Sequence, residues 1–254
     1  NLFTLAALFG GFYAIVMAMN GGFDMAAIGV FCAMVLDSLD GRVARMTNTQ
    51  SAFGEQMDSL SDMVSFGAAP ALIAYEWSLK GLGRWGWIAA FVYCACAALR
   101  LARFNVLTNP LVPGNEKRAA GGDFVGLPSP AAAGMIASLV LILSKIMEAE
   151  GPLDVAVQAW SWTLLPLMLI ISFLMVSNVR FPSFKKLDWT ARARTRGFIL
   201  IIIIGAVVFR YPHYSFPAIF LGYISFSIFR HVFLLKKSEM DPAPDDDDEP
   251  VSKV

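Results

Sequence analysis

Long apolar runs are the feature that most restricts the fold of this chain of 254 residues. A helix that crosses a bilayer needs about 20 largely apolar residues, because the hydrocarbon core is roughly 30 Å thick. Hydrophobic residues make up 57% of the chain, more than the roughly 45–50% of a soluble domain. We therefore predict an all-α, polytopic membrane bundle. Its eight expected helices span residues 2–19, 25–44, 54–76, 85–107, 128–147, 156–177, 196–211 and 215–235.

The distribution of basic residues predicts the orientation of these helices. If Asn1 is cytoplasmic, the outside connections hold only four of the 20 Lys and Arg residues, namely Lys80, Arg84, Lys145 and Arg210. The remaining sixteen fall on the inside, as the positive-inside rule requires. We therefore expect an integral membrane protein with both termini in the cytoplasm, and no cleaved secretory signal at its start.

The end of the chain differs in composition from the rest. Residues 238–254 are acidic and rich in proline, so they cannot bury apolar area. We predict an integral membrane domain over residues 1–237 and a disordered acidic tail over residues 238–254. Metal binding by the aspartate run of the tail is the alternative interpretation.

Four carboxylates in two of the apolar runs carry the chemistry. Asp37 and Asp40 stand three residues apart, and Asp58 and Asp62 stand four apart, so each pair shares one helix face. The short linker 46–53 makes the two helices antiparallel neighbours, which brings the four side chains together. An Asp in the middle of a membrane helix costs roughly 2.5–3.5 kcal/mol, so the four are expected to face a wet cavity and a cation. Carboxylates without His or Cys favour Mg²⁺ or Mn²⁺ over Zn²⁺.

Small and basic residues accompany the carboxylates. Gly41, Ala44 and Gly54 lie close to them in sequence, and a glycine costs about 1 kcal/mol relative to alanine inside a helix. Either a bulky ligand approaches the backbone there or the helices pack closely, and for Gly54 both interpretations stand. Arg42 and Arg45 supply the positive charge that a phosphate-bearing substrate needs, although membrane anchoring also explains Arg42.

These residues together resemble the signature of the CDP-alcohol phosphatidyltransferases. The signature has eight fixed positions, and this sequence matches them with Asp37, Asp40, Gly41, Ala44, Arg45, Gly54, Asp58 and Asp62. The resemblance implies a six-helix core with extra C-terminal helices, a homodimer, and two divalent ions held by the four aspartates. It also implies that Asp62 is the catalytic base. The residues implied in binding the CDP-lipid are Gly41, Ala44, Arg45, Gly54, Asp58, Asn1 and Thr4.

Four further stretches are similar to the membrane-type phosphatidylserine synthases of bacteria and archaea, namely residues 1–4, 100–105, 126–133 and 175–185. This narrower resemblance implies transfer of a phosphatidyl group from CDP-diacylglycerol to serine, at a site that faces the cytoplasm of a bacterial or archaeal cell. Arginine binds carboxylates through a two-pronged fork, so we expect serine to be bound by Arg103, Asn105, Arg118 and Arg180. Membrane anchoring explains each of these basic residues equally well.

Two alternatives to a serine transferase remain. The same reaction with glycerol 3-phosphate or inositol phosphate would need a denser basic pocket. A divalent-cation transporter would need a path that is open to both sides, whereas the intramembrane acidic residues of this chain gather at one end of two helices. No feature of the sequence points to a nucleic-acid partner.

Overall fold

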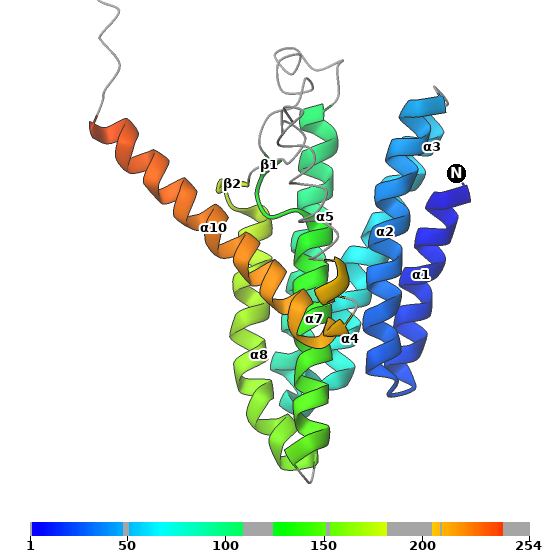
Figure 1. Ribbon diagram of the computed structural model, residues 1–254, viewed down its shortest axis with the longest axis vertical. Coiled ribbons are helices and arrows are strands. Elements are labelled where there is room, and N and C mark those ends of the chain that lie inside the picture. Colours follow the sequence, from blue (N-terminus) through cyan, green and yellow to red (C-terminus); the bar gives the residue numbers. More distant parts are fainter. Residues whose placement is uncertain are drawn as a thin grey trace, which may run out of the picture.

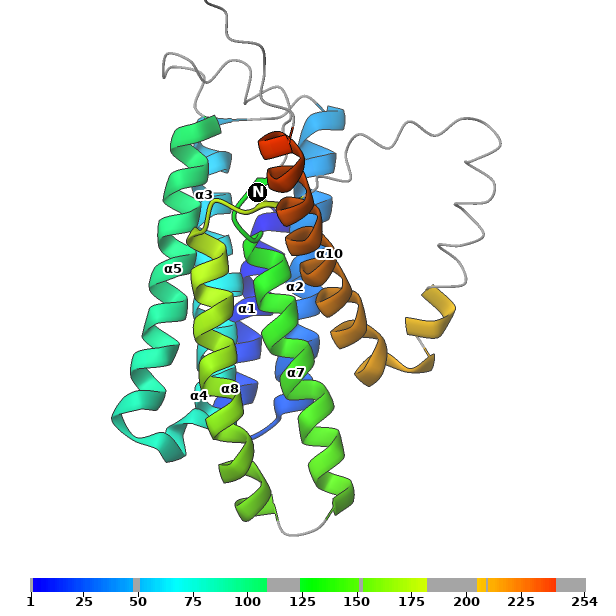
Figure 2. The same ribbon diagram turned by 90° about the vertical axis from the view of Figure 1, so that its left-hand side faces the viewer.

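The computed structural model describes residues 2–47, 51–108, 124–150, 153–181, 205–208 and 210–240. Long helices packed side by side form most of this part of the chain (Figures 1 and 2). They are α1 (Leu2–Met19), α2 (Phe23–Thr47), α3 (Ala52–Asp62), the π-helix η1 (Met63–Ala68), α4 (Ala69–Trp77), the short 3₁₀-helix η2 (Leu79–Leu82), α5 (Arg84–Thr108), α7 (Ser129–Glu150), α8 (Leu153–Val176) and α10 (Pro212–Met240).

The prediction of a helical membrane bundle is confirmed in this coarser form. Within the described part of the chain, four helices are long and apolar enough to cross a membrane, and they span Leu2–Met19, Arg84–Leu107, Ser129–Ile146 and Pro212–Phe233. The predicted helix 54–76 corresponds to α3, η1 and α4 in direct succession. Most of the predicted helix 196–211 lies outside the described residues, so the number of eight membrane helices stays a prediction.

Small residues bring α1 and α2 into close contact. A Cβ atom added to Gly10 would lie 3.2 Å from Ala33 Cβ, and one added to Gly29 would lie 3.0 Å from Ala14 Cβ. Residues of this size let two backbones approach closely, which is how helices associate where no water is available to drive packing. The position of α2, which carries Asp37, is therefore fixed against α1.

The π-helical turn η1 follows the aspartate-bearing face of α3. Pro70 has no backbone N–H, so it cannot donate the usual helical bond to the carbonyl of Phe66 four residues earlier. The Ala69 N–H bonds instead to the carbonyl five residues before it, and the buried Tyr93 hydroxyl donates to Phe66 O at 3.2 Å. π-turns inside helices often occur at functional sites. Here the turn begins directly after Asp62.

A two-residue antiparallel ladder joins the segment before α7 to the segment after α8. It pairs β1 (Phe124–Val125) with β2 (Arg180–Phe181), an addition to the all-helical prediction. Gly126 then turns the chain with a φ of +82°, and a Cβ atom on it would collide with the carbonyl of Met175. Its N–H donates to Val179 O at 2.9 Å. These contacts fix the first turn of α7 against the end of α8.

The last helix, α10, contacts the bundle over its first half. Phe216 stacks on Phe31 of α2 with ring centroids 4.1 Å apart, and Phe220 lies against Gly134 of α7. Figure 1 shows the remainder of α10 leaning away from the other helices.

Candidate metal centre

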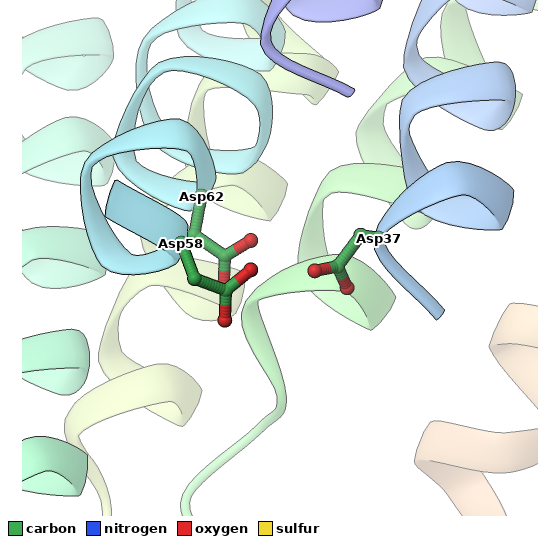
Figure 3. A group of neighbouring side chains, drawn as sticks. All are labelled: Asp37, Asp58 and Asp62. Atoms are coloured by element: carbon green, nitrogen blue, oxygen red, sulfur yellow. The ribbon is translucent and has the colours of Figure 1, made fainter. Parts of the chain in front are cut away.

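Three carboxylates from two helices converge near one end of the bundle. Asp37 belongs to α2, and Asp58 and Asp62 belong to α3. One oxygen atom of each lies within 4.8 Å of the other two. Figure 3 shows Asp58 and Asp62 pointing from one face of α3 toward Asp37. The structure thus brings these three side chains together, as the helix spacing and the short linker predict.

The start of α3 is fixed by a local cap. The Ser51 hydroxyl accepts a hydrogen bond from Gly54 N at 3.0 Å, which satisfies one of the free N–H groups in the first turn. Glu55 adds a negative charge to the same turn, where the helix dipole favours it. Gly54 therefore has a role in the cap, in addition to the ligand or packing role expected from the sequence.

Asp40 lies outside the group defined by the 4.8 Å separation and has a partner of its own. Its Oδ2 accepts a hydrogen bond from Thr4 Oγ1 at 2.5 Å. Thr4 is only 2% exposed, and its backbone carbonyl accepts from Ser61 Oγ at 3.2 Å. One residue of α1 therefore connects the helix of Asp40 to the helix of Asp62. From the sequence, Asp40 was expected to lie with the other three carboxylates. No feature of the sequence predicted its contact with Thr4, 36 residues away.

The charges of this group require a counterion. Asp37, Asp58 and Asp62 are each partly buried, and close like charges with little solvent repel one another strongly. Among the side chains that the structure describes, no Lys or Arg forms an ion pair with them within 4.0 Å. Their donor atoms are all carboxylate oxygens, which are the ligands that Mg²⁺ and Mn²⁺ prefer. These residues therefore fit a hard divalent cation.

Asn105 contacts the helix that carries Asp58 and Asp62. Its Nδ2 donates to Ser59 Oγ at 2.9 Å, next in sequence to Asp58. This contact connects the end of α5 to the helix that carries two of the three carboxylates. Gly41 is exposed on α2 and Ala44 is half-buried one turn further on.

Arg103 contacts the end of α8. Its Nη2 donates to Asn178 Oδ1 at 2.8 Å, and its Nη1 donates to Val176 O at 3.2 Å. The second contact satisfies a carbonyl at a helix C-terminus, where a cation also complements the helix dipole. Asn1 and Arg118 lie outside the described residues, as do the side chains of Arg45 and Arg180.

Arg100 is not among the residues expected at the acceptor site from the sequence. This side chain is 8% exposed, and its Nη1 donates to Ser129 Oγ at the start of α7. Its positive charge attracts the Asp62 carboxylate, although no ion pair within 4.0 Å joins the two. The sequence signals were its place in the stretch 100–105 and its spacing of three residues from Arg103, and neither tells which of the two arginines is buried.

The chain is similar in sequence to proteins of one family. The sequence model of a family described as CDP-alcohol phosphatidyltransferase matches residues 1–179. A Helicobacter pylori (strain ATCC 700392 / 26695) protein named CDP-diacylglycerol–serine O-phosphatidyltransferase is 38% identical over 238 residues, covering 93% of this chain and 92% of the relative. Proteins with the same name from Bacillus subtilis (strain 168) and Methanocaldococcus jannaschii are 31% identical over 185 residues and 34% identical over 155 residues. These matches cover 73% of this chain and 90% of the first relative, and 61% of this chain and 62% of the second.

Proposed function

The chain belongs to the CDP-alcohol phosphatidyltransferase family, and from this premise we propose that it transfers the phosphatidyl group of CDP-diacylglycerol to serine. The products are phosphatidylserine and CMP. The observation that carries the proposal is the similarity to the Helicobacter pylori relative of that name over nearly the whole chain. The group formed by Asp37, Asp58 and Asp62 supports it, because phosphoryl transfer is catalysed mainly by positioning and by charge stabilisation.

We propose that Asp37, Asp40, Asp58 and Asp62 hold two divalent ions, Mg²⁺ or Mn²⁺. When bound, such ions polarise the phosphoryl oxygens and balance the charge of the leaving CMP. The hydrogen bond from Thr4 orients the Asp40 carboxylate, and the cap at Ser51 fixes the start of the helix that carries Asp58.

In the proposed reaction Asp62 is the general base. Its carboxylate takes the proton of the serine hydroxyl, whose oxygen attacks the phosphorus nearest the diacylglycerol. The new bond joins serine to that phosphorus, and the bond that breaks is the pyrophosphate link to CMP. Asp62 suits this role because it is the last carboxylate of α3, directly before the π-turn.

The remaining substrate contacts follow from the family signature. Gly41, Ala44, Arg45, Gly54 and Asp58, with Asn1 and Thr4, are proposed to border the CDP-lipid. Among the residues expected at the acceptor site, which are Arg103, Asn105, Arg118 and Arg180, Asn105 has the strongest support, because its amide is bonded to the residue beside Asp58.

We further propose an eight-helix homodimer in a bacterial or archaeal cell membrane, with the active site and both termini on the cytoplasmic side. Two observations support this orientation. Sixteen of the 20 Lys and Arg residues fall in the connections assigned to the inside. The beginning of α1, the end of α5 and the beginning of α3 all lie at one end of the bundle (Figures 1 and 2).

An acceptor panel tests the proposal. Purified protein in detergent is incubated with CDP-diacylglycerol, Mg²⁺ or Mn²⁺, and serine, glycerol 3-phosphate or inositol phosphate, and CMP release is measured. We expect release with serine alone, and its loss on chelation and in Asp62→Asn. Asp24→Asn is the matched control, because Asp24 lies near the start of α2 and accepts from Ser144 of α7, away from the three carboxylates.

The other outcomes are also informative. Release with a different alcohol would keep the family chemistry and overturn serine as the acceptor. If no acceptor gives CMP release and the protein takes up metal ions into vesicles, the result would favour a divalent-cation transporter.

A further inference from the structure

We propose that Arg100 binds the carboxylate of the amino-acid acceptor and so determines which alcohol the enzyme accepts. This inference rests on the proposed function. It assigns the carboxylate contact to a residue that was not expected at the acceptor site from the sequence. Arg100 is buried, carries an unused donor on its guanidinium, and is bonded to the first residue of α7.

Arg100 is buried without a complete set of partners. The side chain is 8% exposed, Nη1 donates to Ser129 Oγ, and the guanidinium carbon lies 5.9 Å from the centre of the Phe104 ring. Its Nε has no hydrogen-bond partner among the described residues. An unsatisfied buried donor destabilises the folded protein, and it does so more strongly when the group is charged. Such groups are uncommon in folded proteins, and a bound ligand is one reason for them to persist.

The position of Arg100 relative to Asp62 suits a small bifunctional molecule. The two charges attract one another, yet no ion pair within 4.0 Å joins them. The distance between the two charged groups is therefore longer than that of a direct ion pair. In serine only two carbon atoms separate the carboxylate carbon from the hydroxyl oxygen. In the proposed complex the serine hydroxyl lies at Asp62 and its carboxylate lies at Arg100.

The start of α7 adds a second source of positive potential. Ser129 is the first residue of this 22-residue helix, and the free N–H groups and the dipole of a helix N-terminus favour an anion. The hydrogen bond from Arg100 to Ser129 holds the guanidinium at that terminus. Figure 3 shows the first turns of a green helix behind the carboxylates, in the colour of α7. The turn at Gly126 fixes this end of α7 against α8.

Arg103, one turn further along α5, differs from Arg100 in its contacts. It is more exposed, and it donates hydrogen bonds to Val176 and Asn178 at the end of α8. A phosphate of the CDP-lipid is the other anion that could reach Arg100, because arginine binds phosphate and carboxylate with the same fork. The experiment must therefore separate an effect on the acceptor from an effect on the lipid.

The test compares serine with serinamide, which keeps the hydroxyl and the amine but lacks the carboxylate. Steady-state CMP release is measured for the wild type, Arg100→Gln and Arg100→Lys at saturating CDP-diacylglycerol, and the KM for CDP-diacylglycerol is measured separately. Arg84→Gln removes the same charge from the exposed first residue of α5 and is the matched control. Each protein is first checked for a single peak in size-exclusion chromatography.

We expect Arg100→Gln to lower kcat/KM for serine by about tenfold to a hundredfold, the range for a hydrogen bond to a charged group. For serinamide the loss should be about threefold or less, and the KM for CDP-diacylglycerol should stay within about twofold of the wild type. Arg100→Lys should recover part of the activity with serine. Because it keeps the buried charge, it also serves as the test variant if Arg100→Gln does not fold.

Two results would overturn the inference. Equal losses for serine and serinamide would show a structural role for Arg100, and an increase in the KM for CDP-diacylglycerol alone would assign Arg100 to the lipid phosphates. Failure of the proposed function has a different signature, because the wild type would then release no CMP with serine.

Discussion

Asp58→Asn should stabilise the metal-free protein and abolish its response to metal. One oxygen atom of Asp58 lies within 4.8 Å of an oxygen atom of both Asp37 and Asp62. At that separation, and with an effective dielectric constant of about 20, each ionised pair repels by about 3 kcal/mol. The amide keeps the size of the side chain and removes the charge, so the substitution removes two of the three repulsions.

The measurement is thermal unfolding in detergent with EDTA and then with Mn²⁺. A net gain of only about 1 kcal/mol would raise the Tm of a chain of this size by roughly 2–4 °C in EDTA. Saturating metal at about 100 times its Kd stabilises a folded protein by about 2.7 kcal/mol, so the wild type should show a rise of several degrees with Mn²⁺. Asp58→Asn should show little further rise and should release no CMP.

Asp24→Asn provides the control for this experiment. It makes the same chemical change on α2, at a carboxylate that accepts from Ser144, and it should leave the rise in Tm with Mn²⁺ intact. A lower Tm of Asp58→Asn in EDTA, together with a normal response to Mn²⁺, would refute both the repulsion and the metal site.

Two further substitutions test how the neighbouring helices position the carboxylates. Thr4→Val removes the hydrogen bond to Asp40 and should lower kcat by about tenfold, because hydrogen bonds to charged groups contribute roughly 1.5–3 kcal/mol. Thr4→Ser should retain most of the activity, and equal kcat values for the two variants would contradict this role. Tyr93→Phe removes the donor to Phe66 O and should lower the free energy of unfolding by about 1–2 kcal/mol. An unchanged Tm would show that the π-turn does not need this hydroxyl.

The aspartate positions illustrate how far the sequence reaches. Asp58 and Asp62 stand four residues apart, and helix geometry alone places them on one face. The linker between α2 and α3 is too short for anything other than antiparallel neighbours, so Asp37 had to approach them. These relations are local, and each follows from helix periodicity or from the length of a short connection.

The contacts of Asp40 and Arg100 illustrate the opposite case. The Thr4 hydroxyl that bonds to Asp40 comes from a helix 36 residues earlier, and its rotation about the helix axis depends on the small residues packed between α1 and α2. Arg100 and Arg103 look equivalent in the sequence, being basic residues at the same end of α5. The structure buries the first and joins the second to the end of α8.

The sequence by itself predicted the helical membrane class, the convergence of Asp37, Asp58 and Asp62, and a set of carboxylate donors that suits a hard cation, because hydropathy, helix period and ligand chemistry act over short stretches of chain. Only the tertiary structure decided that Asp40 has a partner on α1, that the helix after Asp62 widens into a π-turn bonded by Tyr93, and that Arg100 is buried and bonded to the start of α7. The physical reason is that these features depend on how separate helices rotate and pack against one another, and those rotations are fixed by contacts between residues far apart in the chain.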